Sequence, residues 1–485
     1  MNIILLYPLL SKYRSLNVDN KQYWPPLGLA FIAAVLEQHD HSVKILERDI
    51  ILRRNGLDFE KADEITLAEI ASFNTEIVGI SATTPHMGDA MHIATLIKNC
   101  NPNLKIVLGG PHATSQPELT LRKCRSIDIV VRGEGEFTML DLANGLLLED
   151  IGGITFRDGN GIVRNPDRPL FSNLDELPFP ARHLLDMESY LKPNISVGRG
   201  LNLRATSVFS SRGCPYRCDF CAGHLMFPGK VRFHSPQRVI EELEHLVDCY
   251  SVEAIYFADD MFLSNRKRTE RLLKLLINNE KLNKLKWIAQ VRANVVDEDI
   301  LRLMKKGGCV HLEFGFESGS QRMLDIMHKR TTVEDNVRAA TLTRKVGLRF
   351  SAFVMVGYPG ERKVDVEKTV DFLKTVRPNV ISFSVFYPLP GTEVYRRLVL
   401  QEQRLPEWNE TGDPEATGLT YAEMDSSEFA KLYVKTKLTL VVPNNLYFFI
   451  RDNIRHPIRL LRAFFTHSKG VIIKIARALR RLFTI

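Results

Sequence analysis

The amino-acid sequence predicts an α/β protein with two successive parallel sheets and a helical C-terminal extension. Short apolar runs alternate with helical patterns over the first third of the chain, and the alternation restarts near residue 202. Such alternation is typical of parallel sheets whose strands are joined by helices. The chain of 485 residues is long enough for two to four domains at about 150 residues each. We place the first domain at 1–165, a linker at 166–201, the second domain at 202–400 and the helical region at 401–485.

The first domain is expected to hold five parallel strands and a hairpin. Apolar runs place the strands at residues 3–6, 43–46, 77–81, 106–108 and 127–131. Helical patterns occur at residues 27–38, 88–99 and 136–147. Turn residues at 158–161 predict a hairpin over 154–163, and the proline-bearing stretch 174–180 indicates the end of the domain.

Two glycine-bearing loops directly follow predicted strands. Gly109 and Gly110 follow the fourth strand, and Gly133 and Gly135 follow the fifth. Doubly wound sheets bind ligands at the carboxyl ends of their strands, where glycine lets the backbone approach a ligand closely. Neither loop is a G-x-G-x-x-G fingerprint, which makes a nucleotide site the weaker use of this domain.

The second domain is expected to be an open barrel. Six strand patterns separated by helical ones lie at residues 206–211, 254–258, 286–291, 311–316, 349–356 and 380–386. Six units are too few for a closed eight-stranded barrel, so the sequence predicts a (β/α)6 partial barrel. Function in such barrels lies at the C-terminal strand ends.

Three cysteines follow the first strand of this barrel. Cys214, Cys218 and Cys221 form a C-x3-C-x2-C run, and three thiolates this close can converge on one soft metal centre. A four-iron cluster takes four ligands, so three leave one iron open to a small molecule. The alternative is a structural zinc site, which normally needs four closed ligands. His224 and His234 are the nearest candidates, and neither lies at a typical zinc-ligand spacing.

The cysteine run resembles that of the radical S-adenosylmethionine (SAM) superfamily. In its members the open iron of a [4Fe-4S] cluster holds the amino and carboxylate groups of SAM. One electron from the cluster then splits SAM into methionine and a 5′-deoxyadenosyl radical. The resemblance implies that Cys214, Cys218 and Cys221 are the metal ligands and the catalytic residues.

Residues after the later strands resemble the matching segments of radical SAM enzymes fused to cobalamin-binding domains. That resemblance implies that Glu317 hydrogen-bonds the SAM ribose and that Asp259 lies near the methionine amino group. It also implies that Gly357 lets the fifth strand pass the adenine, which Phe220 flanks. Ala258-Asp259-Asp260 departs from the Gly-Gly-Glu of the family, which leaves open which aspartate meets the amine.

Two further polar residues at the strand ends have two interpretations each. Arg292 and Glu313 either contact a ligand or form an internal salt bridge. We count Arg292 among the expected cofactor-binding residues.

The first domain resembles the Rossmann-like cobalamin-binding type of this class. The segments at residues 24–28, 109–112 and 133–136 match its N-terminal pattern, so Gly109, Gly110, Gly133 and Gly135 are expected to contact cobalamin. The D-x-H-x-x-G motif that supplies a cobalt ligand is missing. His86, in the nearest segment, is expected to be a polar loop histidine. Many members of the class bind cobalamin without such a histidine.

The net charge of +8 is concentrated in a C-terminal tail. Residues 451–485 hold nine Lys or Arg and one acid. Lys474, Arg477 and Arg481 recur at helical spacing among apolar residues, which predicts a basic amphipathic helix on a membrane surface. The alternative is a helix packed on the barrel with its charges in solvent. We expect no nucleic-acid partner, because no recognised module is present.

The composition also indicates the cellular compartment of the protein. Four cysteines outside the motif are scattered singly, which indicates a reducing interior rather than a disulfide framework. The N-terminus lacks the features of a signal peptide, and no apolar run reaches 18 residues. We expect a cytoplasmic protein, peripheral at the inner membrane face.

The expected activity is methylation of an unactivated carbon by a cobalamin-dependent radical SAM methyltransferase. The alternative is a non-methylating cyclisation or rearrangement with the same cofactors. A methylthiotransferase is less favoured, because that family carries three further N-terminal cysteines and only Cys100 and Cys124 occur here. A non-catalytic cobalamin or redox sensor is another alternative. The expected partners are a small-molecule or lipid substrate and an external electron donor such as flavodoxin or ferredoxin.

Overall fold

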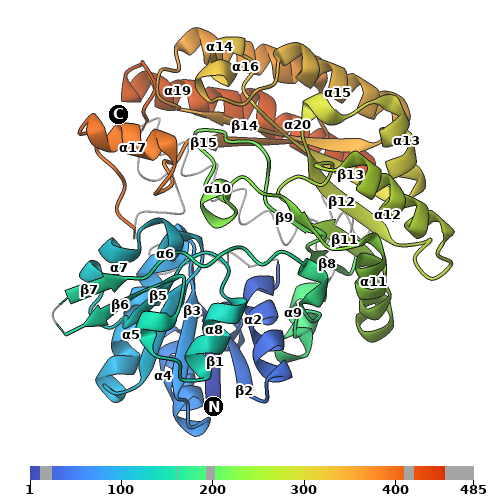
Figure 1. Cartoon of the computed structure of the whole chain (residues 1–485). Helices are drawn as coiled ribbons and strands as arrows, with labels where there is room; N and C mark the ends of the chain where they lie inside the picture. The colour runs from blue at the N-terminus through green and yellow to red at the C-terminus, as the bar shows by residue number, and fades with distance from the viewer. Residues whose placement is uncertain (11–23, 160, 193–202, 409–419, 454–485) are drawn as a thin grey trace.

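The computed structural model describes residues 1–10, 24–159, 161–192, 203–408 and 420–453. Two α/β units, each with a mainly parallel sheet, face one another in Figure 1, and helices α17 (Glu393–Leu400), α19 (Ser426–Thr436) and α20 (Val442–Asn453) follow the second. The predicted fold class is confirmed. The exact domain boundaries stay a prediction.

The first sheet has seven strands in the order β2-β1-β3-β4-β5-β6-β7. They are β1 (Asn2–Tyr7), β2 (Ser42–Glu47), β3 (Ile77–Ser81), β4 (Lys105–Gly109), β5 (Ile129–Val131), β6 (Ile154–Asp158) and β7 (Gly161–Arg164). The first five are parallel, and the predicted hairpin, β6 and β7, adds antiparallel to β5. The strand order reverses between β1 and β3, so a ligand-binding crevice is expected above them.

Alternating apolar residues give this sheet two packed faces. Ile3 and Leu5 of β1 join the core under α2 (Leu27–Gln38) and α8 (Glu136–Ala143), whereas Ile4 and Leu6 face α5 (Met87–Cys100) and α7 (Pro117–Lys123). Three more helices complete the unit, namely α3 (Arg48–Arg54), α4 (Phe59–Ser72) and α6 (Pro111–Ser115). Helix α8 ends before the predicted residue 147, because Gly145 takes a positive φ of 74°.

The second sheet has six parallel strands in the order β15-β14-β13-β12-β11-β8. They are β8 (Ala205–Val208), β11 (Ala254–Phe257), β12 (Lys286–Val291), β13 (Cys309–Glu317), β14 (Arg349–Val356) and β15 (Val380–Val385). Helices α11 (Pro236–Tyr250), α12 (Arg266–Asn278), α13 (Glu298–Lys306), α15 (Val333–Val346) and α16 (Lys363–Val376) cover its outer face (Figure 1). This is the open (β/α)6 barrel that the sequence predicts.

The first predicted barrel strand is shorter in the structure than the range 206–211. Strand β8 ends at Val208, and β9 (Ser211–Arg212) pairs antiparallel with β10 (Arg232–Phe233) instead. The cause is Asp259, whose carboxylate accepts hydrogen bonds from Ser210 N and Oγ, both at 2.6 Å. These bonds turn the chain out of the sheet and start the cysteine loop.

Helix α20 covers the free edge of the barrel. Asn445 accepts a hydrogen bond from Ile381 N at 2.7 Å and donates one to Ile381 O at 3.0 Å, so its amide pairs the edge strand β15 as another strand would. Leu446, Tyr447 and Ile450 of α20 are exposed.

The predicted amphipathic helix with Lys474, Arg477 and Arg481 lies outside the described residues. Within the described ranges, none of the helices has the length and apolar character that crossing a membrane would require.

The linker is anchored to the barrel by a buried ion pair. Arg182 Nη1 lies 2.7 Å from Glu242 Oε1 of α11, and Arg182 Nη2 donates to Ser207 O at 2.9 Å. Both side chains are at most 2% exposed. Arg238 approaches the second oxygen of Glu242 at 3.4 Å.

Arg182→Ala should destabilise the protein by about 3 kcal/mol, since it leaves the buried Glu242 carboxylate with one weaker partner. The matched control is Arg204→Ala, which removes an ion pair to the exposed Glu188 and should cost less than about 1 kcal/mol. Urea unfolding midpoints of the two variants measure the difference. Equal midpoints would contradict this account of the linker.

Candidate active site between the two domains

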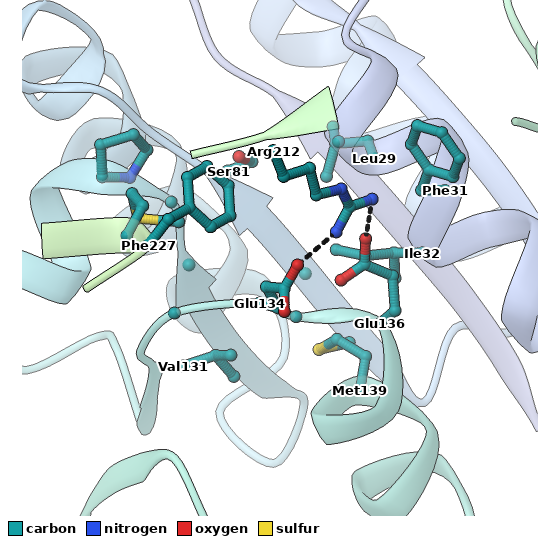
Figure 2. Close-up of a pocket in the computed structure, with 18 of the residues that line it drawn as sticks. Leu29, Phe31, Ile32, Ser81, Val131, Glu134, Glu136, Met139, Arg212 and Phe227 are labelled. Carbon is teal, nitrogen blue, oxygen red and sulfur yellow. Dashed lines mark hydrogen bonds and ion pairs between the residues drawn. The ribbon is translucent and has the colours of Figure 1, made fainter. Parts of the chain in front are cut away.

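A cavity of about 440 Å³ lies between the carboxyl edge of the first sheet and the cysteine loop of the barrel (Figure 2). From the first domain it is lined by Leu29, Ile32, Ser81, Val131 and Met139, among others. From the second domain it is lined by Arg212, Gly223, Phe227 and Asp260, among others. The cavity therefore joins the crevice of the first sheet to the residues around the three cysteines.

The four predicted glycines all line this cavity. Gly110 has a φ of +97°, and a Cβ on it would lie 2.8 Å from Ala82 O. A Cβ on Gly135 would lie 3.0 Å from Ile32 Cδ1. A side chain at either position would therefore displace the neighbouring protein atoms, so the two glycines are needed for this conformation of the cavity wall.

A buried ionic cluster joins the two domains at the cavity. Arg212 Nη1 lies 2.7 Å from Glu134 Oε1, and Arg212 Nη2 lies 2.7 Å from Glu136 Oε1 (Figure 2). Arg232 Nη1 approaches Glu134 Oε2 at 2.6 Å. Although burial alone would raise it, the hydrogen bonds and charges of Arg232 and Arg212 hold the pKa of Glu134 below its usual value. Sequence reasoning missed this cluster. The available signal was the pair of carboxylates in the glycine loop and an arginine two residues before Cys214.

The cysteine loop supplies three thiols of differing exposure. Cys218 is buried, Cys214 is partly buried and Cys221 is exposed. Cys221 N donates to Cys218 O at 3.0 Å. Burial raises the pKa of Cys214. Although Cys221 keeps an open surface, desolvation by the loop raises its pKa to about 11, and the neighbouring Cys218 contributes in the same direction.

The donor set of this loop fits a three-cysteine iron–sulfur cluster. Gly223 N donates to Cys221 Sγ at 3.4 Å, and Arg292 Nη1 donates to Cys218 Sγ at 3.6 Å. Such donors stabilise the negative charge on cluster sulfurs. Within the described ranges no three His, Cys, Asp or Glu side chains are already drawn together as an ion site. The fit therefore rests on the three thiols and on the donors aimed at them.

Asp259 and Asp260, the two aspartates after β11, have different surroundings. Asp259 is 1% exposed, and it accepts a hydrogen bond from Ser211 Oγ at 2.7 Å besides the two from Ser210. Asp260 lines the cavity and accepts one from Gly213 N at 3.0 Å. Its charge also contributes to the raised pKa values of Cys214 and Cys221. Asp260, rather than Asp259, faces the cysteine loop, and a SAM contact by Asp259 stays a prediction.

Glu317 ends β13 in an unusual conformation. Its φ is +61°, a left-handed value that costs energy for a residue other than glycine and is concentrated at functional sites. The carboxylate is 8% exposed and accepts a hydrogen bond from Lys329 Nζ at 2.7 Å. The same ammonium lies 5.8 Å from the ring centroid of Phe220. The predicted ribose contact therefore lies beside the predicted adenine contact, and both contacts stay predictions.

Arg292 braces the cysteine loop from β12. Its guanidinium carbon lies 3.6 Å from the ring centroid of Tyr216, within the loop. It also donates hydrogen bonds to Lys329 O and, at 3.4 Å, to Arg330 O. In the described part of the chain its contacts are with carbonyl oxygens, a sulfur and a ring. An internal salt bridge of Arg292 is therefore not formed there.

Gly357, at the end of β14, adopts a φ of +85°, and a Cβ on it would lie 3.0 Å from Phe429 Cζ. Gly357 N donates to the carboxylate of Glu361, and Gly357 O accepts from Tyr421 N at 3.1 Å. Burial raises the pKa of Glu361 to about 8. The turn after β14 is thus fixed from both sides, and only glycine fits there.

His86 is not among the residues that line the cavity. It is 5% exposed, its Nδ1 lies 2.7 Å from Thr83 Oγ1, and its ring centroid lies 5.1 Å from that of Tyr7. Burial lowers its pKa to about 4, so the ring is neutral at pH 7. These contacts agree with a structural histidine.

A polar row crosses the inner face of the barrel. Tyr256 OH donates to Glu313 Oε2 at 3.0 Å, and Gln290 Nε2 donates to Tyr256 OH at 2.7 Å. Trp24 of the first domain stacks on Tyr256 with ring centroids 4.9 Å apart. Sequence reasoning identified Glu313 but missed Tyr256, because a tyrosine inside an apolar strand pattern gives no local signal of facing inward.

Comparisons with known proteins agree with this arrangement. The B12 binding domain model matches residues 13–143, and the Radical SAM superfamily model matches residues 208–373. An uncharacterized methyltransferase of Pyrococcus horikoshii is 36% identical over 471 residues, which cover 95% of this chain and 94% of the relative. An anaerobic magnesium-protoporphyrin IX monomethyl ester cyclase of Rubrivivax gelatinosus is 28% identical over 82% of this chain and 70% of its own length.

Among solved structures, the radical SAM methyltransferase TsrM from Kitasatospora setae, with cobalamin and a [4Fe-4S] cluster bound, has the same fold. Its TM-score is 0.67 at 20% identity, over 82% of this chain and 75% of TsrM. The expected cofactors, a [4Fe-4S] cluster, SAM and cobalamin, are confirmed by the two family models together with this likeness. The chain belongs to the radical SAM enzymes that carry a cobalamin-binding domain, the family that includes the methyltransferases among these relatives.

Proposed function

We propose that the protein methylates an unactivated carbon of a small-molecule or lipid substrate. The observation that carries this proposal is the shared cavity, which touches the four glycines of the first domain and also Gly223 and Asp260 beside the cysteines. When bound, the cluster and SAM supply a substrate radical and cobalamin supplies the methyl group. A single cavity reaching both sites lets one substrate carbon meet both.

The polar residues of the site have three tasks in that reaction. Cys214, Cys218 and Cys221 hold the cluster. The Asp260 carboxylate offers an acceptor for the SAM amino group, because Asp259 already binds two serines. Glu317 offers acceptors for the ribose hydroxyls.

The walls exclude water and position the substrate. Gly357 and Phe220 offer a flat surface to the adenine, and the row of Tyr256, Gln290 and Glu313 faces the barrel interior. Glu313 is buried, and a buried polar group favours a partner that satisfies its hydrogen bonds over one that does not.

A non-methylating oxidative cyclisation is the second candidate. The relative named as an anaerobic cyclase favours it, since it matches 82% of this chain. Formation of S-adenosylhomocysteine together with 5′-deoxyadenosine separates methylation from cyclisation, because S-adenosylhomocysteine is what remains of SAM only when its methyl group has been transferred.

Replacing any one of Cys214, Cys218 and Cys221 by Ala should abolish 5′-deoxyadenosine formation, since an iron of the cluster loses its ligand. Anaerobic reconstitution followed by mass spectrometry of the nucleosides measures this. Cys249→Ala is the matched control, because Cys249 is an exposed thiol outside the motif. Retention of the product in any of the three motif variants would overturn the assignment.

Gly110→Ala should reduce the cobalamin retained after desalting at least tenfold, because the new methyl group would lie 2.8 Å from Ala82 O and displace the cavity-lining loop at residue 110. Gly145→Ala is the control, since Gly145 has a similar φ of +74° but open space around it. It carries the same backbone strain without changing the cavity. If both variants retain cobalamin as the unchanged protein does, the cavity is not its site.

We also propose that the end of the chain contacts anionic lipid. Leu446 is 47% exposed, Tyr447 60% and Ile450 41%, all on one side of α20. The segment 451–485, with nine cations and one acid, follows directly. Apolar and cationic groups together favour an anionic membrane surface.

A chain ending at Asn453 should lose most of its co-sedimentation with anionic vesicles while keeping α20 on the barrel edge. Vesicles of neutral lipid are the control, and neither chain should sediment with them. Equal sedimentation of both chains with anionic vesicles would place the contact elsewhere.

A further inference from the structure

We propose that three exposed cations around the cysteine loop form the docking surface for an acidic one-electron carrier protein of the flavodoxin or ferredoxin type. They are Arg217, Lys230 and Arg330, and we call them the basic rim. The inference rests on the proposed function, because only a protein with a reducible cluster needs such a carrier.

Two members of the basic rim lie on one side of the loop. Arg217 directly precedes Cys218 and is exposed. Its Nη2 lies 3.3 Å from the position that a Cβ on Gly229 would take, which places it beside Lys230. The backbone oxygen of Lys230 lies 2.3 Å from the Cβ position of Gly213, the residue before Cys214. The turn that carries Lys230 is therefore packed directly against the start of the cysteine loop.

Arg330 is connected to the loop through Arg292. The Arg292 guanidinium donates to Cys218 Sγ at 3.6 Å and to Arg330 O at 3.4 Å. Arg330 has a φ of +52° and an exposed side chain. One buried arginine therefore links a cluster ligand to the backbone of an exposed cation.

The basic rim differs from several other exposed cations in its lack of an acidic partner among the described residues. Within the described ranges none of its three side chains forms an ion pair, whereas exposed arginines elsewhere do, such as Arg204 with Glu188 and Arg302 with Glu298. Of the acids near the loop, Asp219 pairs with His328 and Arg397, and Glu393 pairs with Arg396 at 3.2 Å. The Asp260 carboxylate accepts a hydrogen bond from Gly213 N, within the loop itself. The three cations of the basic rim therefore present their charge to solvent beside the loop, without an ion-pair partner among the described residues.

This charge pattern fits a protein carrier rather than a substrate. Clustered charges of one sign steer a partner of the opposite sign and raise its association rate at low salt. In the step itself the reduced carrier loses one electron and the cluster gains it, so no proton or bond is exchanged. The path of the electron from the docked carrier to the cluster is short, because Arg217 of the docking surface directly precedes the cluster ligand Cys218 in the chain.

The test compares two reductants on one variant. Lys230→Glu with Arg330→Glu reverses two charges and leaves Arg217 and the cysteines unchanged. We measure 5′-deoxyadenosine formation driven by reduced flavodoxin and, separately, by titanium(III) citrate. The variant should be at least tenfold slower with flavodoxin at low salt and unchanged with titanium citrate. The difference should shrink at high salt, because the Debye length falls to about 3 Å at 1 M.

Lys284→Glu is the matched control. Lys284 is exposed, forms no ion pair among the described residues and precedes β12, at the end of the barrel opposite the cysteine loop. It should behave as the unchanged protein with both reductants.

Three outcomes count against the proposals. A double variant as fast as the unchanged protein with flavodoxin overturns the docking surface. An equal loss with both reductants also overturns it, because the two residues then serve the cluster rather than the carrier. If the unchanged protein forms no 5′-deoxyadenosine with titanium citrate, the proposed function fails instead.

Discussion

The buried ionic cluster of Arg212, Arg232, Glu134 and Glu136 is the interaction on which the rest of the structure depends. Two of these side chains come from the glycine loop of the first domain and two from the paired strands β9 and β10 of the second. A buried charge without its partner costs several kcal/mol, so neither half is stable in isolation in this conformation. The cluster therefore fixes how the two domains face one another, and with it the width of the cavity.

Buried arginines also hold the cysteine loop at both of its ends. On one side, Arg212 precedes Cys214 by two residues and is pinned to the first domain. On the other, Arg292 spans from Cys218 Sγ to the backbone at Lys329. Asp259 adds the bend before Arg212 by binding Ser210 and Ser211. Charged and polar groups that lie outside the cysteine motif thereby position the loop.

The strands and helices were largely predictable from the sequence, whereas the ion pairs and hydrogen bonds between residues far apart in the chain were not. Short apolar runs located five strands of the first sheet and six of the second, since a strand that is buried on both faces leaves a local run of apolar residues. The glycines were recognisable because a strand end followed by glycine is also local. By contrast, Arg212 and Glu134 are 78 residues apart in the chain, and no local pattern pairs them. The choice between Asp259 and Asp260 depended on Ser210 and Ser211, which only the fold brings to Asp259. The cover of β15 by Asn445 is equally non-local.

Because the walls of the cavity come from both domains, occupancy of the cavity and docking of the domains are thermodynamically linked. A ligand that binds only the docked arrangement stabilises it by RT ln(1 + [L]/Kd), which is about 2.7 kcal/mol at a hundredfold excess over Kd. Cobalamin bound in this cavity would then stabilise the contact between the two domains. The fraction of the protein loaded with cobalamin would set how much of it is held in the docked arrangement.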